Sequence, residues 1–510
     1  MTVKRILKSI LTVISLAILA AVMVSCGGEL RYSDSTEKLQ SAIDKIQKAE
    51  EITDKRPDIK CTYSYMVSSE VGNKIYEMGI KNVLIMSGRG SADFKANRYN
   101  YYHGTSANES ETFNYSNGKI YAELYNTDYT SPMTEEKFGE FTSDTKYSVD
   151  TEIFDMSDFE EVAVGKDKES GYDVIAFRSD KKTIKDKVID FLGLRETDYV
   201  YGVSDVSMEI FIDKTGEIVE KKLIFTAKYY PEYDSLNSVT YDGVFTYRLD
   251  SKENVTVSDP YISDDVQEIA DINTVYGFLE KSYGVLSTFT TLDATYREYI
   301  KNSDVDKNEY ILENWVNFTE AYRDGKYTYG SIDTQYIKTK DTDGTVSNGM
   351  FIDENGFHSR STAEDYEEVS GGEKPYSDFE FVTMIANTLA SGMPLEKEVE
   401  KLRVTESDNE YIYTYSFTNE VVISYGEYLM SAFTASGEIN ISLEGQAFSV
   451  EKNETVIRVR KSDGCIISHS LKYDVWFGGS IRLESEFDMT VNASGDEVKV
   501  LSVSDWNKNS

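Results

Sequence analysis

The sequence contains little of what most catalytic and metal sites need. Its 510 residues include only three histidines and three cysteines. The histidines, His103, His358 and His469, are far apart, and none lies in a metal-binding or catalytic-triad spacing. No P-loop, dinucleotide fingerprint or Gly-x-Ser-x-Gly turn occurs, and no carboxylate pair stands out among many. Because histidine is the commonest general base and metal ligand, we predict that the protein is not an enzyme and has no metal site and no cofactor.

Positive charge and proline are also scarce. The chain has 53 Lys and Arg against 89 Asp and Glu, which gives a formal net charge of −36. So acidic a surface repels phosphate backbones and anionic lipid head groups, which excludes nucleic acid as a partner and polybasic docking to membranes. Six prolines and 38 tyrosines favour strands over helical bundles. The length predicts more than one domain.

A long apolar run stands at the N-terminus. A basic start precedes the run from Ile10 to Val24, and Ser25-Cys26-Gly27 closes it. The run has about 15 residues, which suits the core of a signal peptide better than a transmembrane span. A small residue directly before a cysteine is what signal peptidase II requires, although Met23 stands where the motif usually has Leu. An ordinary secretory signal and an uncleaved anchor are the alternatives.

We therefore expect a bacterial lipoprotein. Residues 1–25 are the predicted signal peptide, Cys26 is the predicted lipidation site, and residues 26–34 form a tether. The membrane is then a partner through the N-terminal lipid, because buried acyl chains give a lasting anchor without help from charge. The expected location is extracytoplasmic, with the chain anchored to the bacterial membrane by lipidated Cys26. Cys61 and Cys465, in apolar strand settings, are predicted to be unpaired, with a disulfide between them outside the cell as the alternative.

Periodicity divides the rest of the chain into elements. Residues 35–51 have the spacing of an amphipathic helix with Ser35 as its N-cap, and alternating strand patterns follow from residue 60 onward. Three landmarks then occur in order: a turn at Asn117-Gly118, a strand and helix over Tyr172–Leu192, and a turn at Gly216. Glycine or asparagine at such turns supplies the positive φ that a tight hairpin needs.

The same landmarks recur in the second half of the chain. They are a helical spacing from Val266 to Tyr299, a turn at Asn355-Gly356, a strand and helix over Tyr411–Phe433, and a turn at Asp463-Gly464. A repeat of this kind predicts an α+β fold of two similar units, residues 35–262 and 263–510. Each unit is expected to be a curved antiparallel β-sheet, or half-barrel, with helices over one face.

Strict alternation in the late strands of each half assigns the faces of the predicted sheets. In the last strand, Leu483, Phe487 and Met489 point one way while Glu484 and Glu486 point the other. A sheet of this kind is wet on one side and covered on the other. The covered face supplies the candidate ligand-binding residues, which are Met208, Ile210, Phe225, Phe245, Tyr247, Leu471, Tyr473, Leu483, Phe487 and Met489.

The combination resembles a known family. A lipid-anchored start, a helix, a long antiparallel meander, a strand-helix insertion, the turn Asp213-Lys214-Thr215-Gly216 and the acidic exit Val255–Pro260 together resemble LolA/LppX-like lipoproteins. The resemblance implies a curved, unclosed β-barrel with helices over its concave face, once per repeat. It also implies that this concave face binds acyl chains or lipidated cargo.

Two functions remain open from the sequence. One is a noncatalytic protein that binds or carries an apolar ligand, such as lipid, in a groove between sheet and helices. The other is a structural or interaction module of the cell surface, including glycan binding, in which the same faces are packed cores without a ligand cavity. The two hypotheses require the same alternation of residues, so the space between sheet and helices must decide between them.

Overall fold

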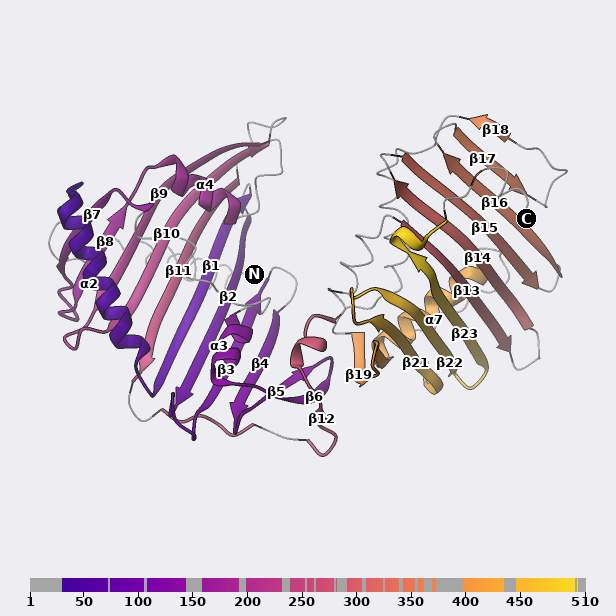
Figure 1. Ribbon diagram of the computed structural model, residues 1–510, viewed down its shortest axis with the longest axis horizontal. Helices are drawn as coiled ribbons and strands as arrows, with labels where there is room; N and C mark the ends of the chain where they lie inside the picture. Colours follow the sequence, from indigo (N-terminus) through magenta and orange to yellow (C-terminus); the bar gives the residue numbers. More distant parts are fainter. Residues whose placement is uncertain are drawn as a thin grey trace, which may run out of the picture. The chain divides into compact units, whose positions relative to one another are not determined.

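The computed structural model describes the larger part of the chain from residue 30 onward. The described residues are 30–71, 74–104, 108–143, 158–191, 199–231, 239–252, 255–260, 263–278, 281, 291–304, 309–323, 326–338, 343–353, 356–361, 369–372, 398–434, 446–499 and 502. The predicted signal peptide and Cys26 lie outside them. The chain divides into two compact units, one of residues 1–123 with 130–264 and one of residues 124–129 with 265–510 (Figure 1).

The first half of the chain forms long strands and three described helices. In chain order the elements are α2 (Thr36–Asp54), β1 (Ile59–Val71), β2 (Lys74–Ser87), β3 (Lys95–His103), β4 (Asn108–Ser116), β5 (Lys119–Leu124), β6 (Thr127–Pro132), α3 (Glu135–Ser143), β7 (Glu161–Lys166), β8 (Asp173–Arg178), α4 (Lys182–Phe191), β9 (Tyr199–Ile212), β10 (Ile218–Pro231) and β11 (Val239–Ser251). Helix α2 begins where the sequence predicts, since the Ser35 hydroxyl accepts a hydrogen bond from Lys38 N.

The sheet of the first unit is an open antiparallel meander that is joined at its middle. Its strands run in the order β6-β5-β4-β3-β2-β1-β11-β10-β9-β8-β7. The first strand therefore pairs with the last, with Tyr63 opposite Tyr247. Strands β1 to β6 extend to one side of this pair, and β11 back to β7 extend to the other. The predicted antiparallel sheet is confirmed.

Helices α2, α3 and α4 cover one face of this sheet. Ala42, Ile46 and Ala49 of α2 are buried in one core with Ile184 and Val188 of α4 and the inward side chains of the strands. Helix α3 packs farther along the same face, with Phe141 edge-on to Phe113 at 5.2 Å between ring centroids. The apolar positions of each helix fall three or four residues apart, which is why one face of each can be buried.

The second half of the chain has the following described elements. They are β12 (Gln267–Glu268), η2 (Ile272–Thr274), β13 (Thr291–Asp304), β14 (Glu309–Arg323), β15 (Lys326–Lys338), β16 (Asp343–Asp353), β17 (Gly356–Ser361), β18 (Val369–Gly372), β19 (Val399–Glu406), β20 (Glu410–Phe417), α7 (Asn419–Thr434), β21 (Phe448–Arg460), β22 (Ile466–Phe477), β23 (Ile481–Ser494) and η4 (Gly495–Glu497).

The sheet of the second unit repeats the strand order of the first. It runs β18-β17-β16-β15-β14-β13-β23-β22-β21-β20-β19, so its first strand again pairs with its last. The predicted landmarks fall at equivalent places: between β4 and β5 and between β16 and β17, at the strand and helix β8-α4 and β20-α7, and between β9 and β10 and between β21 and β22. Asn355 of the predicted Asn355-Gly356 turn lies outside the described residues. The prediction of two similar units, each an unclosed sheet with helices, is confirmed.

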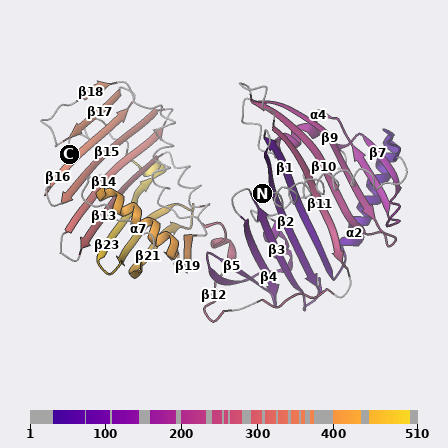
Figure 2. The ribbon, with the colours of Figure 1, turned by 180° about the vertical axis from the view of Figure 1, so that it is seen from behind.

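Helix α7 lies over the sheet of the second unit (Figure 2). Its Val422 carbonyl accepts a hydrogen bond of 2.8 Å from the Tyr473 hydroxyl, and Tyr425 packs edge-on against the Tyr473 ring. The opposite face of the same strands carries ion pairs such as Arg482 with Asp474. The alternation predicted for β22 and β23 is therefore confirmed, with one side of the sheet covered and the other charged.

One element was wrongly predicted. The helical spacing predicted from Val266 to Tyr299 is wrong at its two described ends, which form the short pieces β12 and η2 and, from Thr291, the long strand β13, while residues 282–290 lie outside the described residues. Leu292 and Ala294 alternate with more exposed residues and join the core of the second unit. Tertiary pairing with β23 and β14 decides the conformation here, and Thr and Tyr suit a half-buried strand better than a helix.

Candidate functional site

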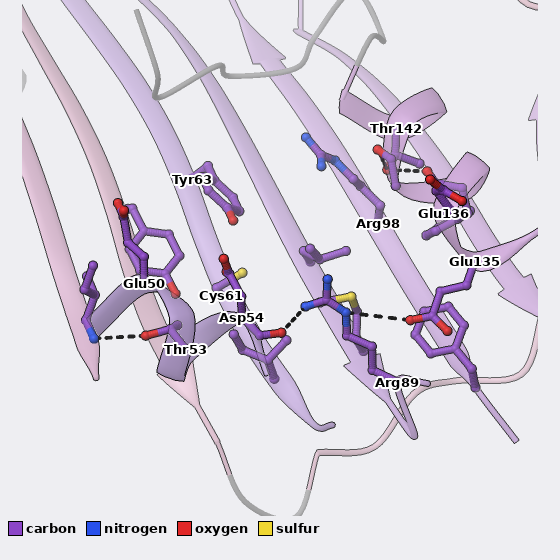
Figure 3. Close-up of a pocket in the computed structure, with 18 of the residues that line it drawn as sticks. Glu50, Thr53, Asp54, Cys61, Tyr63, Arg89, Arg98, Glu135, Glu136 and Thr142 are labelled. Carbon is purple, nitrogen blue, oxygen red and sulfur yellow. Dashed lines mark hydrogen bonds and ion pairs between the residues drawn. The ribbon is translucent and has the colours of Figure 1, made fainter. Parts of the chain in front are cut away.

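A cavity of about 750 Å³ lies between the sheet and the helices of the first unit (Figure 3). Strands β1 to β3 form its floor, the end of α2 borders it on one side, and α3 borders it on the other. The lining residues are Glu50, Thr53, Asp54, Ile59, Cys61, Tyr63, Leu84, Met86, Arg89, Phe94, Arg98, Glu135, Glu136, Phe138, Gly139, Thr142, Ile218, Lys221 and Tyr247. The volume falls within the range of small-molecule sites in proteins.

Strand register makes one end of the floor apolar. Ile59 of β1 lies opposite Met86 of β2, and two residues farther along, Cys61 lies opposite Leu84. Phe94 and Phe138 add aromatic rings at this end of the cavity. Consecutive inward positions on a strand are about 7 Å apart, so these side chains form a continuous apolar strip that suits a hydrocarbon chain.

The sheet becomes polar beside and beyond this strip, where Arg98 still lines the cavity and the residues of the following row do not. Arg98 of β3 lies opposite Leu84, and Asn82, Asn100 and Glu111 follow side by side on β2, β3 and β4. The two asparagines are fully buried. Asn82 Nδ2 donates to Asn100 Oδ1 at 2.8 Å, and Asn100 Nδ2 donates to Glu111 Oε2 at 3.3 Å. We call Asn82, Asn100 and Glu111 the polar ladder.

Arg98 is held against this ladder. Its Nε donates to Asn100 Oδ1 at 3.2 Å and its Nη2 reaches Asn82 Oδ1 at 3.5 Å. The side chain is 7% exposed and borders the cavity. In Figure 3 it reaches across the cavity floor between Tyr63 and Thr142. The arrangement places a buried guanidinium beside the apolar strip.

Ion pairs connect the elements at the rim. Arg89, in the β2–β3 loop, donates to the Asp54 carbonyl of α2 at 2.6 Å and pairs with Glu135 of α3 at 3.6 Å. On the other side, Lys221 pairs with Glu50 at 2.6 Å. Two of the rim carboxylates are thus neutralised by cations, and α2 is joined to α3 across the opening.

The interior of the cavity does not favour ionisation of its weak acids. Burial raises the pKa of the Cys61 thiol to about 12 and the pKa of the Tyr63 hydroxyl well above its usual range. The pKa of Tyr247 is raised for the same reason. Cys61 and Cys465 are both buried and free, as predicted. A thiol of this kind is protonated at neutral pH and is a poor nucleophile.

A buried ionic cluster fixes the end of α2 next to the cavity. The Glu217 side chain, fully buried at the β9–β10 turn, pairs with Arg56 and, at 2.6 Å, with Lys252. Lys252 also pairs with Asp213 at 2.6 Å. Thr53 of α2, which lines the cavity, accepts a hydrogen bond from Ile218 N at 3.1 Å. This cluster determines where α2 ends and therefore where the cavity wall stands.

The cluster predicts a loss of stability in acid. Burial of Asp213 opposes its ionisation, but hydrogen bonds from Lys252, Thr215 and backbone N–H groups outweigh burial and lower its pKa to about 2, from an ordinary 3.8. A carboxyl whose pKa is lower in the folded state stabilises the fold above its unfolded pKa, and this contribution is lost as pH falls through the folded one. The thermal stability of the first unit should therefore decrease as the pH falls from about 4 to about 2.

The variant Asp213→Asn tests whether Asp213, rather than the other acidic residues of the chain, causes this loss of stability. The variant should have a lower melting temperature than the wild type at pH 7, and the difference should shrink as pH falls below about 4. The measurement is a series of calorimetric scans of both proteins from pH 7 to pH 2. A difference that stays constant over this range would contradict the assignment of the lowered pKa to Asp213.

The second unit contains a smaller cavity of about 260 Å³. It is lined by Asp271, Asn273, Thr274, Phe278, Lys281, Tyr411, Tyr413, Val459, Arg460, Lys461 and Gly464. The rings of Phe278 and Tyr413 stack at 3.7 Å, and the Lys461 ammonium lies over the Tyr411 ring.

Strand β22 of the second unit buries His469, and this burial lowers the pKa of the imidazole to about 4. The ring is therefore neutral at physiological pH.

The predicted ligand residues divide between core and cavity. Tyr247 lines the large cavity. Met208, Ile210, Phe225 and Phe245 are buried in the core that α2 and α4 cover, and none of them lines the cavity. In the second unit, Leu471, Tyr473, Leu483 and Met489 are buried and Phe487 is half-buried beside His469. None of these five lines the smaller cavity.

Sequence reasoning missed the α3 wall and the arginine on the floor. Helix α3 has readable signals, because Thr134 caps Lys137 N at 3.2 Å and Phe138 and Phe141 are three residues apart. Arg98 could have been found as a cation at an inward strand position, two residues before Asn100 on the same face of β3. The pattern of β3 was recognised only as a strand, without a face.

Two further observations concern metal and membrane. Within the described ranges, no group of three or more His, Cys, Asp or Glu side chains could hold a metal ion. None of the helices in the described part of the chain has both the length and the hydropathy that crossing a membrane requires.

Comparison with known proteins gives structural similarities only. No family model matches the chain, and no curated protein matches it. Among solved structures, LprF from Mycobacterium bovis is similar over 44% of this chain and 94% of its own, with 9% identity and a TM-score of 0.23. A LolA superfamily protein from Nitrosomonas europaea covers 43% of this chain and 94% of its own, with 11% identity and a TM-score of 0.14.

A third similar structure is a putative outer membrane lipoprotein-sorting protein domain from Vibrio parahaemolyticus. It covers 45% of this chain and 95% of its own, with 8% identity and a TM-score of 0.14. The resemblance to LolA/LppX-like proteins is thus found again among solved structures. At these identities and TM-scores the similarities carry no argument about ligand or activity, which must come from the residues of the cavity.

Proposed function

We propose that the protein is a noncatalytic binder or carrier of an apolar or amphipathic ligand, such as a lipid, and that the large cavity of the first unit holds it. The observation that supports this most is a 750 Å³ space over an apolar strip, where the rival hypothesis expects a packed core. Burying hydrocarbon contributes about 0.8 kcal/mol per methylene. A short acyl chain along Ile59, Leu84 and Met86 therefore provides useful affinity.

The chemistry of the lining supports binding over catalysis. The buried thiol of Cys61 and hydroxyls of Tyr63 and Tyr247 have raised pKa values, so they remain protonated. The rim carboxylates Glu50 and Glu135 are engaged by Lys221 and Arg89. These groups can hold and orient a ligand through hydrogen bonds and charge.

Titration with a neutral apolar dye tests this proposal. N-phenyl-1-naphthylamine fluoresces strongly when it leaves water, so the full mature chain should show saturable binding with about one site, and unlabelled fatty acid should displace the dye. Failure of the folded protein to bind the dye or extracted lipid would contradict the proposal. The structural or interaction module, including a glycan binder, would then be the better account.

We also propose that Cys26 is lipidated and anchors the chain on the extracytoplasmic side of the bacterial membrane. Mass spectrometry of the native N-terminus should find a diacylglyceryl thioether on Cys26, and Cys26→Ala should release the protein or leave it as a precursor. The support is the charged start, the short apolar core and the Ser25-Cys26 junction. A mature N-terminus at another residue would contradict it.

The two units are proposed to be copies of one ancestral domain, with boundaries at residues 35–262 and 263–510. Their shared strand order supports this, because independent meanders have many alternative orders. The cavity lining nevertheless differs between them, so we assign ligand binding to the first unit.

A further inference from the structure

The large cavity has a chemical polarity that points to one class of ligand. Along the strands, the floor changes from the apolar row of Ile59 and Met86 to the row of Leu84 and Arg98, and the polar ladder lies in the next row of the sheet, outside the cavity lining. A ligand that follows this floor meets hydrocarbon at one end and a guanidinium at the other. This inference rests on the proposed function and adds the nature of the head group.

Arg98 has the geometry of an anion-binding residue. Asn82 and Asn100 hold its Nε and Nη2 edges, and both amides are themselves fully buried and fixed by the ladder. The guanidinium is thus oriented before a ligand arrives, which reduces the entropy lost on binding. Its planar array of N–H donors matches the oxygens of a carboxylate or phosphate, and such charged hydrogen bonds are strong where water is excluded.

Arg98 places a positive charge in the cavity although the chain as a whole is acidic. Burial lowers the pKa of Arg98 from its usual range, which means that the charged form loses solvation there, while Glu111 acts in the opposite direction. At the rim, Glu50 and Glu135 are neutralised by Lys221 and Arg89. An anionic head group that passes the rim gains a cation inside it.

We propose that Arg98 binds the head group of an anionic amphiphile, a carboxylate or phosphate, whose hydrocarbon chain lies along Leu84, Met86 and Ile59. The neighbouring Thr142 hydroxyl is engaged with the Phe138 carbonyl at 2.8 Å, so it stabilises α3 and leaves the head group to Arg98. A neutral amphiphile of the same chain length uses only the apolar strip.

Three ligands with one chain length test the proposal: dodecanoate, dodecyl phosphate and dodecanol, each displacing N-phenyl-1-naphthylamine from the full mature chain. Arg98→Met should weaken binding of at least one anion by about 10-fold or more and leave dodecanol within about twofold. Arg98→Lys keeps the charge and should lose less. Comparison of the two anions shows which head group Arg98 prefers.

Arg248→Met is the matched control. Arg248 lies on β11, on the exposed face of the sheet opposite the cavity, and pairs with Asp250, so its loss should change none of the three affinities. Equal weakening of dodecanol and the anions by Arg98→Met, or no change in either anion, would overturn the head-group assignment. If Arg98→Met loses the near-ultraviolet circular dichroism of the wild type, that variant is not folded. The three titrations of Arg98→Lys are then judged by the same criteria. A wild type that binds neither dye nor ligand would instead overturn the proposed function.

Discussion

Glu217→Gln is expected to destabilise the first unit by about 3 kcal/mol. Removing one partner of a buried ion pair costs this much because it leaves desolvated charge behind. The Glu217 side chain is fully buried between Arg56 and Lys252 and also accepts a hydrogen bond from Thr215 at 2.7 Å. Glutamine preserves the shape of the side chain and removes its charge, so the expected loss is electrostatic.

The measurement is chemical unfolding of the full chain, followed by a probe in the first unit. Glu161→Gln provides the control, because Glu161 pairs with Arg178 at a site where both side chains are more than one third exposed. Exposed pairs contribute about 1 kcal/mol or less. Similar losses for the two variants would show that the Glu217 cluster is no more than a surface ion pair.

Gly139→Trp is expected to reduce ligand affinity by about 10-fold or more, because the indole takes up volume that the ligand needs. Gly139 lines the cavity from α3, and a Cβ atom at this position has no other atom within 4 Å. The same change should not destabilise α3, since glycine inside a helix is less favourable than tryptophan. Loss of binding with unchanged stability therefore distinguishes a blocked cavity from a damaged fold.

Gly202→Trp controls for the added aromatic ring. Gly202 lies in β9, also has open space beside it, and does not line the large cavity. Dye and dodecanoate titrations should give wild-type affinity for this variant. If Gly139→Trp binds both ligands as tightly as Gly202→Trp does, the ligand must occupy another place.

The fold could be predicted from the sequence where local chemistry determines it. Ser35 caps α2 as its position predicts, and alternation places Leu483 and Met489 on the buried face. The turns and the strand-helix pair that recur in both halves of the sequence predicted two sheets with the same strand order. By contrast, Thr291–Tyr299 was misjudged because helical spacing over a short window is outweighed by pairing with β23, which comes from the far end of the chain.

The site could be predicted only in part, for a physical reason. Alternation identifies a covered face, and the same pattern describes a packed core and a cavity floor. Phe225 and Phe245 follow this pattern and lie in the core, whereas Tyr247, two residues farther along β11, lines the cavity. Where α2 ends and α3 begins determines which inward residues remain uncovered, and this depends on contacts distant in sequence, such as Arg89 with Glu135.

Photolabelling tests the central claim most directly. A dodecanoate analogue with a diazirine near its tail would be bound to the full mature chain, irradiated, and mapped by peptide mass spectrometry, with and without excess dodecanoate. The account predicts labelling that dodecanoate suppresses, within residues 50–61, 84–98 and 135–142, which contribute most of the cavity lining. Suppressible labelling confined to the strands of the second unit, around Leu471 and Leu483, would contradict it.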